Sequence, residues 1–155
     1  PLRGPRHSST TPLSPPMTVD SIMTREVVTV QGDTALTDLR ALLHDRGFRH
    51  LLVVDNGDLM GVISDRDLIR ELSPWLGSAA ETRRDVATLN RRAHQVMSRR
   101  PVTAAPGDSV ASACARFIDE DVSCLPVVDE ANRPVGIVTW RDLLVVLARV
   151  ASRAG

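Results

Sequence analysis

The sequence predicts an α+β fold, α/β-like in the order of its elements, in which one β-α-β-β-α unit occurs twice. Three observations lead to this prediction. Four sequence blocks recur in the same order, with separations that agree within one residue. Apolar residues at helical spacing follow the first blocks of each copy. Two apolar runs on either side of Asn56-Gly57 predict a β-hairpin.

The duplication covers most of the chain. The matching blocks are residues 21–30 and 95–104, 32–34 and 107–109, 51–55 and 125–129, and 61–68 and 136–143. We therefore divide the sequence into a disordered tail (1–16), repeat 1 (17–72), a linker (73–92), repeat 2 (93–150) and a short tail (151–155). Met17 is interpreted as the natural start of the protein.

Within repeat 1 each element has a local signal. A helix is expected after Asp33 or Thr34, either of which can act as N-cap. Leu36, Leu39 and Leu43 share one face of this helix. The other expected elements are a strand at 27–30, hairpin strands at 51–54 and 59–63, and a helix at 64–72. In the linker, residues 82–93 are expected to form a helix.

The hairpin strands are almost continuously apolar and lack the alternation of a strand with one face in water. Such strands are covered on both faces, by helices, by another repeat or by a partner. A single unit of about 55 residues is marginally stable by itself. The two repeats are therefore expected to pack together.

The composition excludes several functional classes. The formal net charge is zero and all 19 basic residues are Arg, which argues against a general nucleic-acid binder. The Arg pairs at 83–84, 91–92 and 99–100 are interpreted as a solvated surface. No run approaches the length of a membrane span. Cys114 and Cys124 lie in apolar stretches and are interpreted as reduced, buried thiols of a cytoplasmic protein.

Two short motifs carry the chemistry: Ser64-x-x-Asp67 and Thr139-x-x-Asp142, each placed directly after an apolar strand. A hydroxyl three residues before a carboxylate is a capping pattern that can begin a helix. The same groups can bind a vicinal diol, because one carboxylate accepts hydrogen bonds from both hydroxyls. Both interpretations remain open, and they are compatible.

The blocks resemble the cystathionine-β-synthase (CBS) domain family. The resemblance rests on the entry segment ending at Met23, the strand at 125–129, and the stretches 61–67 and 136–142, and it extends over about residues 17–150. It implies two repeats packed about a pseudo-twofold axis, often in a homodimer. It also implies two clefts that bind an adenosine-containing ligand: AMP, ADP, ATP or S-adenosylmethionine.

The resemblance also implies residue roles. Ser64, Asp67, Thr139 and Asp142 would hold the ribose of the ligand. The remaining candidates are Arg66, Arg141, Arg49 and His50 for phosphates, and Thr29 and Thr103 for base or ribose. Repeat 2 has Ser123 and Cys124 where repeat 1 has Arg49 and His50, so the two sites are expected to differ.

The sequence departs from the family pattern at two positions. Leu52 occupies the position of Pro126, which gives repeat 1 a backbone donor that repeat 2 lacks. Trp140 lies inside the second motif, where its ring would either stack on a base or narrow the cleft.

An enzymatic function finds little support. The histidines lack metal-ligand spacing, and the Gly-Lys-Ser/Thr phosphate loop is missing from a chain without Lys. The first hypothesis is a stand-alone regulatory module, without catalytic activity, that binds an adenine nucleotide and signals in trans to an unknown protein partner. The alternative is a ligand-free dimeric interaction scaffold. A nucleic-acid-binding accessory is a weaker third hypothesis.

Overall fold

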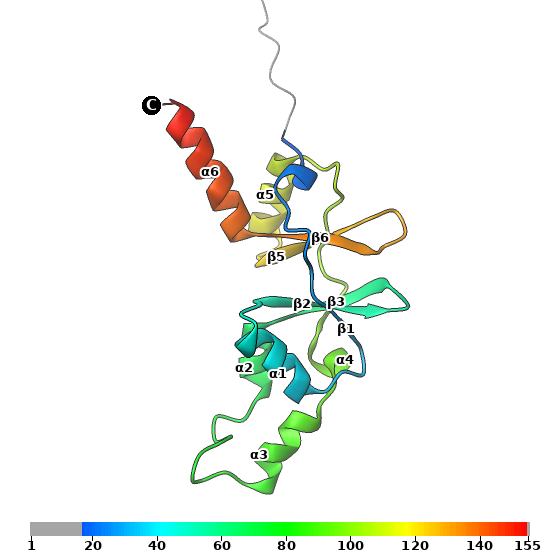
Figure 1. The fold of residues 1–155 in the computed structure, drawn as a ribbon, viewed down its shortest axis with the longest axis vertical. Helices are drawn as coiled ribbons and strands as arrows, with labels where there is room; N and C mark the ends of the chain where they lie inside the picture. The colour runs from blue at the N-terminus through cyan, green and yellow to red at the C-terminus, as the bar shows by residue number, and fades with distance from the viewer. Residues whose placement is uncertain (1–16, 155) are drawn as a thin grey trace, which may run out of the picture.

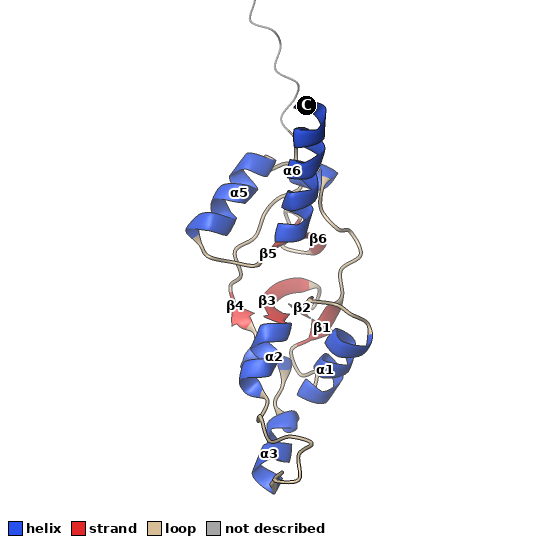
Figure 2. Cartoon of the chain, turned by 90° about the vertical axis from the view of Figure 1, so that its left-hand side faces the viewer, coloured by secondary structure: helices blue, strands red, loops and turns tan. Residues whose placement is uncertain are grey.

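The computed structural model describes residues 17–154, so the expected disordered tail at 1–16 lies outside the described residues. Two sheets face each other at the middle of the molecule, with helices on their outer sides (Figure 1, Figure 2). The elements are η1 (Val19–Ser21), β1 (Thr29–Gln31), α1 (Leu36–Asp45), β2 (His50–Asp55), β3 (Asp58–Ser64), α2 (Asp65–Glu71), α3 (Arg83–Ala87), η2 (Thr88–Asn90), α4 (Ala93–Val96), β4 (Ser98–Arg99), α5 (Val110–Asp119), β5 (Cys124–Val128), β6 (Pro134–Thr139) and α6 (Trp140–Ala154). The predicted α+β fold of two related repeats is confirmed.

Repeat 1 contains a four-stranded sheet in the order β1-β2-β3-β4. Strand β1 runs parallel to β2, while β2 and β3 form the predicted antiparallel hairpin. At its turn, Asn56 and Gly57 have φ values of 50° and 91°. A two-residue hairpin turn needs this left-handed backbone, and Asn and Gly tolerate it best.

Repeat 2 has the smaller sheet, β5-β6, and one proline explains why it lacks a counterpart of β1. In repeat 1, Leu52 N donates to Val28 O at 2.9 Å and thereby extends the pairing of β1 with β2. Pro126 stands at the equivalent position and has no N–H to donate. The preceding segment of repeat 2 therefore meets β5 at an isolated bridge between Ala104 and Val127.

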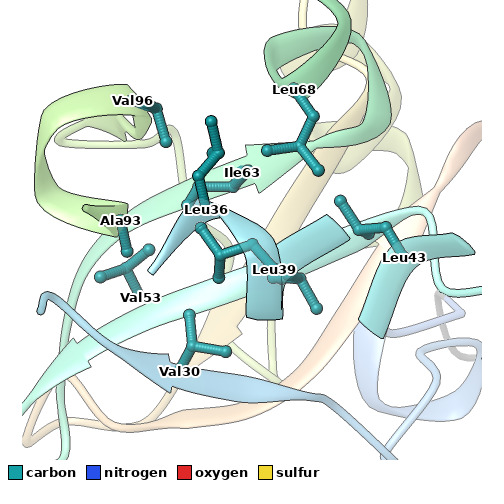
Figure 3. Close-up of a cluster of buried hydrophobic side chains, with 10 residues drawn as sticks. Val30, Leu36, Leu39, Leu43, Val53, Ile63, Leu68, Ala93 and Val96 are labelled. Atoms are coloured by element: carbon teal, nitrogen blue, oxygen red, sulfur yellow. The ribbon is translucent and has the colours of Figure 1, made fainter. Parts of the chain in front are cut away.

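Each repeat has its own aliphatic core. In repeat 1 the predicted apolar face of α1, formed by Leu36, Leu39 and Leu43, packs against Val53 and Ile63 of the sheet (Figure 3). The corresponding core of repeat 2 includes Ala113, Phe117, Leu125, Val127 and Val138. Both cores are covered by helices on the outer side of the sheets (Figure 2).

The N-cap of α1 is Ala35, so the prediction of Asp33 or Thr34 was wrong. Ala35 pairs with Arg92 in an isolated antiparallel bridge, and Leu36 N donates to Arg91 O at 2.8 Å. This pairing keeps Ala35 extended and delays the helix. It also ends the linker helix early: α3 stops at Ala87, and the chain is extended again at Arg91, short of the predicted end at 93.

The first segment of each repeat packs on the other repeat. Val19 and Met23 are buried in the core of repeat 2, whereas Ala93 and Val96 are buried in that of repeat 1. Backbone hydrogen bonds fix the first crossing, because Thr24 and Ile137 exchange two N–H···O bonds of 2.9 Å each. We call residues 17–24 and 93–99 the crossing segments.

The glycine before each motif leaves room for a crossing segment. A Cβ atom at Gly61 would lie 2.6 Å from Met97 Sδ and 2.8 Å from Ser98 O. At Gly136 a Cβ atom would lie 2.5 Å from Met23 Sδ. All three distances are shorter than van der Waals contact, and at Gly61 the obstacle includes a backbone oxygen, so a side chain there would displace the crossing segment.

The hairpin turns of the two repeats also contact each other. Leu59 N donates to Asn132 O at 3.0 Å, and Asn132 Nδ2 donates to Leu59 O at 3.1 Å. We call this pair the hairpin clamp. It holds the repeats together at one end of the sheets, whereas α3 projects beyond repeat 1 at the far end of the molecule (Figure 1). Among residues 17–154, no helix combines the length and apolar character needed to cross a bilayer.

Candidate functional site

Two clefts lie between the repeats, and each joins the motif end of one repeat to the loop before the hairpin of the other. Cleft A, of about 250 Å³, lies between Ser64 and Asp67 of repeat 1 and residues 121–124 of repeat 2. Cleft B, of about 270 Å³, lies between Thr139 of repeat 2 and residues 47–50 of repeat 1. The clefts are equivalent in position and similar in size.

In cleft A the motif forms a complete capping box at the start of α2. Ser64 N and Oγ each donate to Asp67 Oδ2 at 2.7 Å, and Asp67 N donates to Ser64 Oγ at 3.3 Å. The capping interpretation is therefore confirmed. Among the hydrogen bonds of residues 17–154, none reaches Asp67 Oδ1. The carboxylate thus caps the helix with one oxygen, and its other oxygen accepts no hydrogen bond from the described residues.

In cleft B the motif forms two of these three hydrogen bonds and has a different exposure. Thr139 N and Oγ1 donate to Asp142 Oδ2 at 2.7 and 2.9 Å. Thr139 lines the cleft, but Asp142 and Arg141 are not among its lining residues. Cleft B therefore presents the hydroxyl end of its motif, whereas cleft A presents the hydroxyl and the carboxylate.

Cleft A has the stronger set of basic groups. Arg66 and Arg70 of α2 both line it, one helical turn apart, together with His50. No ion pair of either arginine occurs within the described part of the chain. Arg70 was missed in the sequence, although its spacing of four from Arg66 places both on one helix face. Cleft B contains Arg49 and His50, and its charge is reduced by Glu26.

His50 lies at the junction of the repeats. Its Nε2 is 3.2 Å from Ser123 Oγ of repeat 2. Burial lowers the pKa of His50 below its usual 6.5, although Asp65 and Asp67 act in the opposite direction. The equivalent residue of repeat 2 is Cys124, whose pKa is raised to about 12 by burial and the nearby Asp67. Its thiol therefore stays neutral at physiological pH.

Besides Arg141 and Asp142, two further sequence candidates lie outside the clefts. Thr29 is exposed on β1, because Val30 points into the core and its neighbours must point outward. Thr103 borders a separate cavity of about 680 Å³. There Arg116 donates to Thr103 O at 2.6 Å and pairs with Asp108 at 2.8 Å. Neither threonine contacts the residues that the motifs bring together.

The loops that close the clefts were also missed in part. Asp121 and Val122 line cleft A, and Gly47 and Phe48 line cleft B. Gly47 and Asp121 both have positive φ, at 68° and 50°, directly after the helices α1 and α5. A glycine just after a helix is a stop signal. Gly47 therefore marks the loop of repeat 1 in the sequence. Asp121 takes the same backbone conformation in repeat 2, but an aspartate gives little indication that a helix has ended.

Trp140 neither stacks in a cleft nor narrows one. Its ring centroid is 5.0 Å from that of Phe117, and its Nε1 donates to Val122 O at 3.2 Å. Val122 is a wall residue of cleft A. The indole therefore supports the loop of cleft A from outside the cleft.

Comparison with known proteins identifies the duplicated unit. The CBS domain family matches residues 19–74 and 93–149. The protein MJ1225 of Methanocaldococcus jannaschii is 34% identical over 127 residues, which cover 81% of this chain and 45% of that protein. A CBS domain-containing protein of Dictyostelium discoideum is 34% identical over 85% of this chain and 92% of its own length. The chain thus spans less than half of the first relative and nearly all of the second.

Solved structures share the arrangement of the two repeats. The structure of MJ1225, described as a putative archaeal homologue of the γ subunit of AMPK, has a TM-score of 0.74 at 32% identity, over 84% of this chain and 48% of that one. The cytosolic domain of the Mg²⁺ channel MgtE, solved with ATP, has a TM-score of 0.67 at 29% identity, over 84% and 48%. The CBS domain pair of MJ0100, solved with 5′-methylthioadenosine and S-adenosyl-L-methionine, shares the fold at 24% identity with a TM-score of 0.72, over 86% and 98%.

Proposed function

The chain belongs to the CBS-domain family, and from this premise we propose that it is a cytoplasmic regulatory module that binds an adenosine-containing ligand and signals to a partner protein. The ligand is AMP, ADP, ATP or S-adenosylmethionine, held between the repeats. One observation carries the proposal. In cleft A a carboxylate with an available oxygen, Asp67 Oδ1, lies with Arg66 and Arg70 in a single cleft. Hydroxyls of a ribose and oxygens of a phosphate are the groups that these side chains recognise.

The position of the clefts suggests how binding becomes a signal. A ligand in cleft A contacts α2 of repeat 1 and the 121–124 loop of repeat 2 at the same time. The hairpin clamp at Asn132 holds the repeats at another point. A ligand that fits one relative orientation better shifts the population toward that orientation. A partner that prefers the same orientation then binds more tightly by the same coupling free energy.

The test is calorimetric titration of the wild-type protein and of Asp67→Ala with each of the four ligands. We expect micromolar binding by the wild type and a loss of at least about tenfold in Asp67→Ala, since bonds to a charged acceptor are lost. Asp85→Ala is the matched control, because Thr82 and Asp85 form the same capping box on α3, away from both clefts. Its affinity should equal that of the wild type.

The outcomes separate three functions. Binding that is lost in Asp67→Ala and kept in Asp85→Ala supports the regulatory module. An equal loss of affinity in both variants would mean that Asp67 acts only as a helix cap and does not contact the ligand. No heat with any of the four ligands would contradict nucleotide binding and favour the interaction scaffold.

We also propose a homodimer formed through the outer helices. Four large apolar side chains are 61–73% exposed there: Ile69 on α2, Ile118 on α5, and Leu144 and Leu147 on α6. Ile69 and Leu144 occupy equivalent positions of the two repeats, and a twofold interface would bring the same apolar patch of two subunits together. Light scattering should give twice the chain mass for the wild type and one chain mass for Leu144→Glu/Leu147→Glu. A monomeric wild type would exclude the dimer.

A further inference from the structure

One side chain belongs to both clefts. His50 lines cleft A together with Ser64 and Arg66, and it lines cleft B together with Arg49 and Thr139. The reason lies in the strand register. His50 begins β2 and pairs with Ser64 at the end of β3, so it stands beside the motif of its own repeat. At the same time it ends the 47–50 loop, which forms the wall of cleft B.

The equivalent position cannot supply a second group of this kind. Cys124 begins β5 and pairs with Thr139 in the same register. It lines cleft A but is not among the lining residues of cleft B. A neutral thiol offers a phosphate no positive charge, whereas a protonated imidazole offers a charge and two N–H donors. The two clefts therefore share a single imidazole.

We propose that His50 is a specificity-determining residue that couples the two clefts, so that a phosphate-bearing ligand in one cleft weakens the binding of a second such ligand in the other. This inference rests on the proposed function. Two phosphates that approach the same ring repel each other and compete for its N–H donors. A nucleoside without a phosphate has no such conflict. The pair of clefts is thus suited to one phosphorylated ligand together with one unphosphorylated nucleoside.

The coupling is measured with single-cleft proteins as references. Ser98→Trp fills cleft A and Glu26→Trp fills cleft B, and both replaced side chains are exposed lining residues. Neither substitution touches a motif, so both helix caps stay intact. Asp67→Ala serves as a second variant that weakens cleft A, because Asp67 lines that cleft. Each protein is titrated calorimetrically with AMP and with adenosine, and circular dichroism confirms that each is folded.

We expect the weaker AMP site of the wild type to bind about tenfold less tightly than the same cleft does when the other cleft is blocked. Adenosine should show no such difference. In His50→Gln the difference for AMP should become smaller, because the competition for the imidazole is gone, while the direct repulsion between the two phosphates remains. One cleft of the wild type could show no AMP binding and yet bind AMP when the other cleft is blocked. This result would also support the coupling.

Two results would overturn the proposal in distinguishable ways. Wild-type AMP constants equal to those of the single-cleft proteins would show independent clefts, while the proposed function would stand. A cleft that never binds AMP, even when the other is blocked, would equally exclude coupling between two phosphate sites. No binding of AMP or adenosine to any of the proteins would overturn the coupling together with nucleotide binding.

Discussion

Cleft A and cleft B are built from equivalent backbone positions but present different side chains. Cleft A contains the full Ser64–Asp67 motif with Arg66 and Arg70. The residue of α6 that corresponds to Arg70 is Val145, and cleft B receives only the hydroxyl end of its motif. Duplication of a fold therefore fixes where a cleft lies, and single residues on its walls decide what the cleft can bind.

The largest expected difference between the repeats lies in their cores. Phe117 fills the core of repeat 2 and contacts Trp140, whereas Leu43 occupies the equivalent place in repeat 1. Phe117→Ala should lower the free energy of unfolding by about 3–5 kcal/mol, and Leu43→Ala by about 2 kcal/mol, because Leu43 is slightly exposed. Urea denaturation measures both. A larger loss of unfolding free energy in Leu43→Ala than in Phe117→Ala would show that the core of repeat 1 tolerates the removal of a side chain less well.

The sheets can be made more alike by exchanging one residue. Leu52→Pro removes the N–H that bonds to Val28 O and leaves that carbonyl without its donor. We expect a loss of about 1–3 kcal/mol in the free energy of unfolding by urea. Pro126→Leu is the reverse exchange and should cost less, since it adds a donor. If Leu52→Pro were neutral, the proline would not explain the smaller sheet of repeat 2.

Removal of Arg70 should make cleft A resemble cleft B. Arg70→Ala is expected to weaken AMP binding about tenfold through the loss of charge-assisted hydrogen bonds to phosphate, and to leave adenosine binding unchanged. Calorimetry with both ligands separates these effects. Val145→Ala is the control at the equivalent position of repeat 2 and should change neither. Weaker adenosine binding in Arg70→Ala would indicate that Arg70 maintains the shape of the cleft and does not act on the phosphate alone.

The smallest expected effect is the response of His50 to pH. Its folded pKa lies below 6.5 because of burial, so the unfolded chain takes up this proton first as the pH falls. The free energy of unfolding should therefore decrease as the pH falls through 6.5 toward the folded pKa. His50→Gln should show less of this decrease, and the difference between the two proteins isolates the contribution of His50. A decrease identical in both proteins would mean that His50 is not the responsible group.

Much of the fold follows from local sequence signals. The duplication, the Asn56-Gly57 turn and the face formed by Leu36, Leu39 and Leu43 each have a direct counterpart in the structure. The start of α1 does not, because the pairing of Ala35 with Arg92 depends on a segment 57 residues away. Contacts between distant segments override local capping preference in such cases.

The candidate site was predictable where motifs carry it. Ser64, Asp67 and Thr139 follow from the repeated pattern, whereas the loops at 47–50 and 121–124 join them only through packing between the repeats. Thr29 and Thr103 were placed by resemblance to relatives, and the direction of their side chains depends on local strand pairing. The shared position of His50 has no signal in the sequence, because it arises from the register of β2 against β3.

Because of the crossing segments, the core of repeat 1 is built from one continuous stretch of the chain and the core of repeat 2 from two separate stretches. All parts of the first core lie between residues 28 and 97, so this half is continuous and can fold as soon as that stretch has been synthesised. The second core combines Val19 and Met23 with residues after 102, and Val110 N bonds to Met17 O. Its first segment must therefore wait for nearly the whole chain. The half that contains both the earliest and the latest described residues is the last to be completed, and a nascent chain would pass through a stage with one finished half and one exposed N-terminal segment.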